Sequence, residues 1–159
     1  PRNLVIILGK LYEVAAELRP DKREVYRGNY ERLKAEIEKL VDKYGGSLSG
    51  YKAVITTAEI QPAIDWLGVN VVAVAVMELA EPPSPKGLEE VLKAIREGDV
   101  IVFIAVTCSG GTCKPASPLD EAVLEEARRA GVKVVEVPLG YTAGSVVWKL
   151  EYIVSQLGS

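Results

Sequence analysis

Four short apolar runs alternate with amphipathic segments from residue 50 to the end of the chain. The runs cover Tyr51 to Thr57, Val69 to Val76, Val100 to Val106 and Val132 to Val137, and Val, Ile and Ala dominate them without regular polar alternation. Such runs are typical of strands that helices cover on both faces of a parallel sheet. We therefore predict an α/β fold with a four-stranded parallel sheet, doubly wound in Rossmann-like βα repeats.

The amphipathic segments between these runs carry signals for the start and end of helices. Ser84 is followed by a proline at the first helical position, and Gly98 provides a left-handed stop. Ser117 and Asp120 open a second such segment, which Gly131 closes. Two more helices are predicted over 61–67 and 143–157.

The first third of the chain follows a helical period instead. Asp21 and Glu24 form the pattern of a capping box, and apolar or tyrosine positions then recur every three or four residues up to Tyr44. This predicts one long helix over 20–46, preceded by a helix within 1–19 and followed by an α/β lobe over 50–159.

The start of the first helix is apolar on every side, which requires a partner surface. We expect its apolar side chains to pack back on the domain or to be buried in a homodimer. They are Leu4, Ile6, Ile7 and Leu8.

Charge and hydropathy exclude two classes of partner. The 22 acidic and 19 basic residues give a net charge of −3 without a basic face, so we do not expect nucleic acid to bind. The apolar runs are much shorter than the roughly 20 residues of a membrane-spanning helix, so no transmembrane segment is predicted.

The chain begins at Pro1 without a leader pattern, and we expect it to be a mature or trimmed part of a longer protein. Abundant charged residues would suit a thermophile.

Three segments resemble the zinc- and manganese-type solute-binding proteins of ABC transporters. The long helix that joins their two lobes resembles residues 25–44, VYRGNYERLKAEIEKLVDKY. Their Glu-Pro-Ser-Pro loop and the helix after it resemble residues 80–100, AEPPSPKGLEEVLKAIREGDV. Their last strand, turn and terminal helix resemble residues 137–157, VPLGYTAGSVVWKLEYIVSQL. The resemblance covers nearly the whole chain but only the second half of such a receptor.

This resemblance implies a C-terminal lobe or a single-lobe relative, with residues 1–19 as the remnant of the other lobe. It implies an extracytoplasmic protein, anchored to the membrane in its full-length form, that binds zinc or manganese and serves an ABC permease. It also implies a binding protein and not an enzyme.

Ligands of open parallel sheets bind beyond the carboxyl ends of the strands. The loops expected there form the predicted ligand cleft, with Thr56, Thr57, Glu78, Thr107, Tyr141 and Thr142. In the resembled family the first loop carries a ligating histidine and the last strand a ligating aspartate. Those positions fall on Thr57 and on or near Val137, and the chain has no histidine. The usual metal ligands are therefore missing.

Glu59, Cys108 and Cys113 are the remaining candidate metal ligands. Glu59 is the nearest carboxylate, although an acid in the first turn of a helix also has an ordinary structural role. The cysteines flank Ser-Gly-Gly-Thr, and a disulfide between them is our first interpretation. Two thiolates that hold copper(I), or two inert thiols, are the alternatives.

Other functions have less support in the sequence. Cys108 has no histidine base, and no phosphate-binding fingerprint follows the two glycines. The pairs Glu89–Glu90 and Glu125–Glu126 read as surface charge. A metal-free structural or interaction module that assembles as an oligomer is the main alternative to a binding protein, and a small α/β enzyme ranks last.

Overall fold

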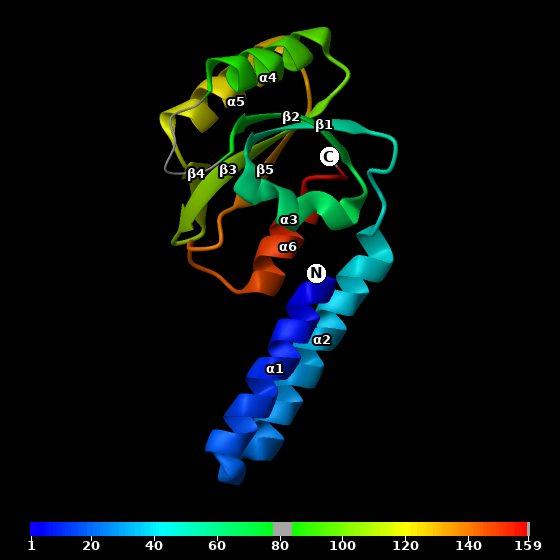
Figure 1. Cartoon of the computed structure of the whole chain (residues 1–159), viewed down its shortest axis with the longest axis vertical. Coiled ribbons are helices and arrows are strands. Elements are labelled where there is room, and N and C mark those ends of the chain that lie inside the picture. The colour runs from blue at the N-terminus through cyan, green and yellow to red at the C-terminus, as the bar shows by residue number, and fades with distance from the viewer. Residues whose placement is uncertain (78–83, 159) are drawn as a thin grey trace. The chain divides into compact units, whose positions relative to one another are not determined.

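A computed structural model describes residues 1–77 and 84–158, and the chain divides into two compact units, Pro1–Gly45 and Gly46–Ser159. The first unit is a helical hairpin of α1 (Arg2–Leu18) and α2 (Arg23–Tyr44), joined by a 3-10 turn over Pro20–Lys22 (Figure 1). The rings of Tyr12 and Tyr30 stack across the hairpin with centroids 5.6 Å apart.

The predicted capping box at the start of the long helix is wrong. The N-cap of α2 is Lys22, and no side chain caps it by a hydrogen bond. The Asp21 carboxylate instead accepts two hydrogen bonds from Arg19, at 3.0 and 2.9 Å. The proline of the connection starts a 3-10 turn, which moves the beginning of α2 two residues beyond the expected cap.

The second unit contains five strands. They are β1 (Lys52–Thr57), β2 (Asn70–Val76), β3 (Ile101–Ser109), β4 (Thr112–Pro115) and β5 (Val134–Pro138). β2, β1, β3 and β5 lie side by side in that order and are parallel, as predicted. On one face of the sheet lie α4 (Pro85–Glu97) and α5 (Pro118–Ala130), and on the other lie α3 (Gln61–Ile64) and α6 (Val146–Ser155), with 3-10 turns over Ala58–Ile60 and Asp65–Leu67 (Figure 1).

Every second residue of β3 faces the core layer between the sheet and the helices α4 and α5. Val102, Ile104, Val106 and Cys108 belong to one buried cluster with residues of α4 and α5. The predicted helix starts in this layer are confirmed, since the hydroxyl oxygens of Ser84 and Ser117 accept hydrogen bonds from backbone N–H groups of the first turns. Gly98 and Gly131 end the two helices in the left-handed conformation.

The fifth strand was not predicted. β3 runs to Ser109 and turns through Gly110 and Gly111, whose φ angles are +58° and +83°, into the antiparallel β4. Two consecutive positive φ angles match the tight two-residue hairpin turns that favour glycine pairs. The predicted cleft loop after β3 is therefore a β-hairpin.

Two sets of backbone hydrogen bonds place this hairpin. The Ala105 carbonyl accepts from Ala116 N–H at 3.0 Å, while the next carbonyl, of Val106, accepts from Leu139 N–H after β5 at 3.1 Å. Successive backbone groups of a strand point to opposite sides, so β4 lies on the side of β3 that faces away from β5. That is the side of β1, which pairs with β3 only over Ile101–Phe103. The hairpin consequently continues the sheet beyond the carboxyl end of β1.

Candidate functional site at the carboxyl edge of the sheet

Two buried threonines end β1. Thr56 is 1 % exposed, and its Oγ1 accepts a hydrogen bond from the backbone N–H of Ala105 at 3.2 Å. Asp120 Oδ1 accepts from the same N–H at 3.0 Å. The N–H needs these side chains because the backbone pairing of β1 with β3 stops before it, and a buried donor without a partner is costly.

Asp120, which the sequence predicts only to start a helix, also anchors that helix to the sheet. Its side chain is buried in the first turn of α5, and its Oδ2 accepts a hydrogen bond from the Ser117 hydroxyl at 2.5 Å. The Ser117 Oγ accepts in turn from the Asp120 backbone N–H at 3.2 Å. Asp120 therefore fastens the start of α5 to the middle of β3, at the point where β1 stops pairing.

Thr57 presents a buried hydroxyl at the carboxyl end of β1. The residue is 4 % exposed, and its Oγ1 has no hydrogen-bond partner among the residues that the structure describes. Glu59 follows in the first turn of the 3-10 helix and is exposed to solvent. A hydroxyl and a carboxylate thus stand close in sequence at the edge where parallel sheets bind ligands.

The two cysteines form a disulfide, with an S–S distance of 2.09 Å. Cys108 on β3 lies directly opposite Cys113 on β4, and Thr107 lies opposite Lys114. Cys108 is 6 % exposed and belongs to the α4/α5 layer of the core. The disulfide interpretation is the one that the structure shows, and in this state neither sulfur is the thiolate that copper(I) requires.

Side chains of the same unit donate hydrogen bonds to the backbone carbonyls of the turn after β5. The Thr142 hydroxyl donates to the Leu139 carbonyl at 2.8 Å, and Lys149 Nζ donates to the carbonyls of Leu139 and Gly140 at 3.0 and 2.8 Å. Burial lowers the pKa of Lys149 below its ordinary value. Tyr141, in contrast, is 68 % exposed.

Other predicted site residues fall in three different settings. Val137 is buried inside β5, opposite Ala105. Glu78 lies outside the described residues. Within 1–77 and 84–158 no three His, Cys, Asp or Glu side chains gather closely enough to hold a metal ion, so Glu59 does not form such a group with the two cysteines. The ligand role of Glu59, Cys108 and Cys113 stays a prediction.

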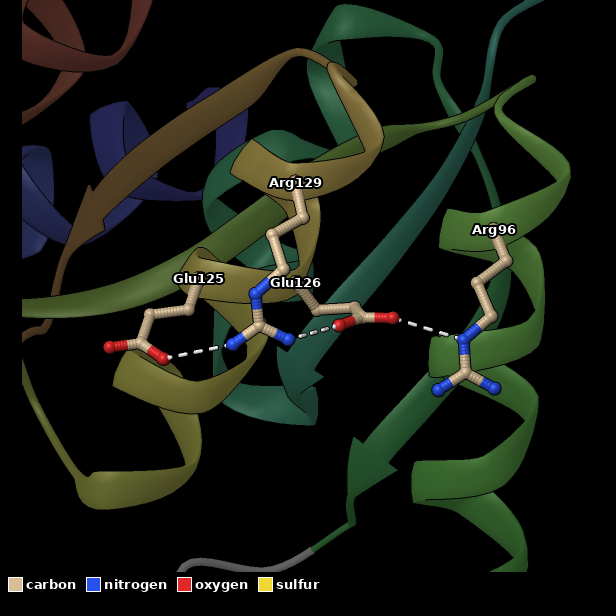
Figure 2. Close-up of polar contacts among 4 residues, drawn as sticks. All are labelled: Arg96, Glu125, Glu126 and Arg129. Carbon is tan, nitrogen blue, oxygen red and sulfur yellow. Dashed lines mark hydrogen bonds and ion pairs between the residues drawn. The ribbon is translucent and has the colours of Figure 1, made fainter.

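A separate ionic cluster lies on the surface of α4 and α5. Figure 2 shows the Glu126 carboxylate between two guanidinium groups, with Arg96 Nε at 3.0 Å and Arg129 Nη1 at 3.0 Å. Arg129 also reaches Glu125, at 3.4 Å. Both carboxylates are paired with arginine, which agrees with their interpretation as surface charge.

The family of this chain follows from a comparison with known protein families. A family model described as "Zinc-uptake complex component A periplasmic" matches residues 1–140. The chain belongs to this family. It is a family of solute-binding proteins of ABC transport systems, not an enzyme class, and its description places it outside the cytoplasm. No described helix is both long and apolar enough to cross a membrane.

Solved structures of metal-binding proteins share the fold of this family member. The periplasmic zinc-binding protein TroA from Treponema pallidum has a TM-score of 0.65 and 16 % identity, covering 94 % of this chain and 57 % of that chain. AdcAII from Streptococcus pneumoniae has a TM-score of 0.68 and 16 % identity, covering 99 % and 58 %. FpvC from P. aeruginosa, in complex with Ni²⁺, has a TM-score of 0.62 and 18 % identity, covering 92 % and 54 %.

Each of these matches leaves much of the relative unmatched. The chain spans only 54–58 % of the length of the three proteins, and at these identities the likeness shows the fold alone. A comparison with curated proteins by sequence finds no match.

Proposed function

We propose that this chain acts as one lobe, equivalent to the C-terminal lobe, of an extracytoplasmic receptor that delivers a divalent metal ion to an ABC permease. The family match supports the receptor role. The observation that carries the proposal is the Thr57 hydroxyl, which is buried without a partner in the described residues at the carboxyl end of β1, two residues before the exposed carboxylate of Glu59.

The ligand chemistry at this edge favours an oxygen-seeking cation. Carboxylate, hydroxyl and water oxygens suit Mn²⁺ better than they suit a soft ion, and the sulfurs of Cys108 and Cys113 are held in a disulfide. The structural neighbours bind different ions, since FpvC has been solved with Ni²⁺ and with Mn²⁺ and TroA is described as zinc-binding. Of these ions, we propose Mn²⁺ as the cargo of this chain.

The described residues offer too few ligands for a closed cation site. Because no cluster of three ligating side chains exists among them, water or a second lobe must supply the rest. We therefore expect the chain alone to bind Mn²⁺ weakly, in the range of exposed sites, and to bind it through Glu59.

Calorimetric titration of the chain with Mn²⁺ tests this. The wild type is expected to bind one ion, and Glu59→Gln to weaken binding at least about tenfold, because it removes the charged ligand that offsets dehydration of the ion. The matched control is Glu151→Gln, an exposed carboxylate on α6, which should bind as the wild type does.

Two results would refute the proposal. One is the absence of heat and of any shift in thermal midpoint with Mn²⁺, Zn²⁺ or Ni²⁺. The other is equal binding by the Glu59 and Glu151 variants. Repeating the titration with copper(I) after reduction tests the alternative of a thiolate site at Cys108 and Cys113, which predicts binding only by the reduced protein.

A further inference from the structure

The helix α1 carries two apolar stripes on opposite sides. Val5, Gly9, Tyr12 and Ala16 form the stripe that belongs to the hairpin: Tyr12 stacks on Tyr30 of α2, and Ala16 is buried. Ile7, Leu11, Val14 and Leu18 form the second stripe, with the same steps of four, three and four residues. Nine residues separate Ile7 from Ala16, which at about 100° per residue places them half a turn apart.

The second stripe is exposed along its whole length. Ile7 is 55 % exposed, Leu11 60 %, Val14 53 % and Leu18 75 %. Steps of four and three residues are the spacing of a coiled-coil seam, in which each apolar side chain inserts between residues of a facing helix. Single exposed apolar residues are ordinary, but a continuous seam of this kind is typical of a surface that binds another helix.

We propose that this stripe pairs with the same stripe of a second copy of the chain, antiparallel and about a two-fold axis. The midpoint of the stripe lies between Tyr12 and Glu13, so the antiparallel arrangement sets Leu11 beside Val14 of the second copy. It likewise sets Ile7 beside Leu18 of the second copy. Each contact occurs twice because a two-fold interface is self-complementary.

The charges beside the stripe favour this partner and this direction. Lys10 and Glu17 flank it on one side, and Leu8 and Ala15 flank it on the other. In the antiparallel pair, Lys10 of each copy faces Glu17 of the other, which gives two ion pairs between the copies. A parallel pair would instead place Lys10 and Glu17 beside the apolar flank of the second copy, which offers no opposite charge, and flanking charges are what set helix orientation.

The ion pair that Lys10 makes within one chain does not compete strongly. Its Nζ lies 2.8 Å from Glu13 Oε2, but both side chains are more than half exposed. Such surface pairs contribute little to stability, so Lys10 can exchange Glu13 for Glu17 of a second copy at low cost. The apolar flank of Leu8, which is half-buried, and Ala15 widens the seam on the other side.

The seam is short, and this sets the expected affinity. Ile7 to Leu18 spans roughly 17 Å of helix at 1.5 Å per residue. That is a small interface, at the low end of specific protein contacts, so we expect a dissociation constant on the order of 10 µM. The proposal is independent of the metal role, because it rests on α1 alone.

Sedimentation equilibrium of the whole chain, from about 1 to about 300 µM, tests the pairing. The wild type is expected to shift from the 17.2 kDa monomer toward twice that mass. Leu11→Glu should stay monomeric across this range, because it places two carboxylates in the apolar seam. The matched control is Val25→Glu, an equally exposed valine at the start of α2 and off the stripe, which should dimerise as the wild type does.

Charge reversal tests the direction. Lys10→Glu and Glu17→Lys should each weaken the dimer about fivefold or more, since each replaces two attractive contacts by two repulsive ones. The double variant K10E/E17K should restore wild-type affinity, which an unrelated structural defect would not do. Circular dichroism confirms that each variant keeps its helices.

A wild type that stays monomeric at all concentrations overturns the proposal and assigns the stripe to another occupant, such as a second lobe. Failure of the double reversal to recover affinity overturns the antiparallel register. Equal loss of dimer in the Leu11 and Val25 variants would show that the stripe is not the contact surface.

Discussion

The two units of the chain treat their apolar side chains differently. In the α/β unit, the central strand β3 is buried from Ile101 to Val106, and helices lie on both faces of its sheet. In the helical unit, the buried apolar residues are Ala16 and Ile37, while one full side of α1 is exposed. Both units have amphipathic helices, but only the α/β unit covers the apolar side of each one.

This difference follows from what each architecture can do alone. A parallel sheet offers two apolar faces, and helices α4 and α5 on one side and α3 and α6 on the other cover them within one chain. A two-helix hairpin has a single internal seam, so a helix with two apolar stripes leaves one uncovered. The α/β unit is therefore expected to hold most of the stability of the chain, and the helical unit to gain stability from a partner.

The largest expected effect comes from emptying the centre of the sheet. Phe103→Ala removes a ring that is 0 % exposed, on the strand that pairs with both β1 and β5. It should lower the free energy of unfolding by about 3–5 kcal/mol, through lost burial and the cavity left behind. Urea denaturation measures this. Val25→Ala on α2, where the valine is 61 % exposed, should stay within about 0.5 kcal/mol, and a loss comparable to that of Phe103→Ala would contradict the comparison.

The next effect tests the polar anchor of the α/β unit. Asp120→Ala should cost about 2–3 kcal/mol, because the Ala105 N–H and the Ser117 hydroxyl both lose a buried charged acceptor. Glu121→Ala, one residue later and exposed, should cost much less. If the two variants unfold at the same urea concentration, Asp120 is not the anchor that its contacts indicate.

A smaller effect is expected from the disulfide. The cross-link closes a loop of about six residues, for which chain entropy gives about 2 kcal/mol. The double variant C108A/C113A should therefore unfold at a lower urea concentration than the oxidised wild type. Reduction of the wild type should give a similar loss, and free-thiol counting before and after reduction shows which state is measured. No difference between oxidised and reduced protein would contradict this.

Much of the fold could be predicted from local patterns. The runs around Val54 and Ile104 indicated buried parallel strands, and the caps at Ser84 and Ser117 indicated where helices begin. The capping box at Asp21 failed because Pro20 starts a 3-10 turn before α2 and Arg19 binds the Asp21 carboxylate, and the Asp-x-x-Glu pattern shows neither feature. β4 was missed because Gly110 and Gly111 were considered as a loop between cysteines and not as a hairpin turn.

Less of the candidate site than of the fold could be predicted from the sequence. The edge that carries Thr57 and Glu59 was expected from the parallel strands, and a disulfide was the first of three interpretations of the two cysteines. The anchoring role of Asp120 could not follow, because it depends on where β1 stops pairing with β3, which is a property of register. Nor does spacing tell that Thr142 and Lys149 turn inward to close the loop after β5.

The smallest expected effect is the pH dependence of stability that comes from Tyr152 on α6. Burial and the hydrogen bond from its hydroxyl to the Glu136 carboxylate together raise the pKa of Tyr152 to about 12, with burial as the larger cause. Because the folded-state pKa lies above the ordinary value near 10, this stabilisation is complete below pH 10 and is lost as the pH rises to 12. Tyr152 is only partly buried, so we expect a loss of about 1–2 kcal/mol over this interval.

Tyr152→Phe should remove this part of the pH dependence, since phenylalanine has no proton to lose. Urea denaturation of the two proteins between pH 9 and about pH 12 gives the difference directly, and the wild-type advantage should shrink across the range. Tyr141→Phe, which changes an exposed ring in the same unit, serves as the control and should retain the wild-type slope. If Tyr152→Phe kept that slope as well, the contact between Tyr152 and Glu136 would not be its source, and alkaline unfolding would have to begin elsewhere in the chain.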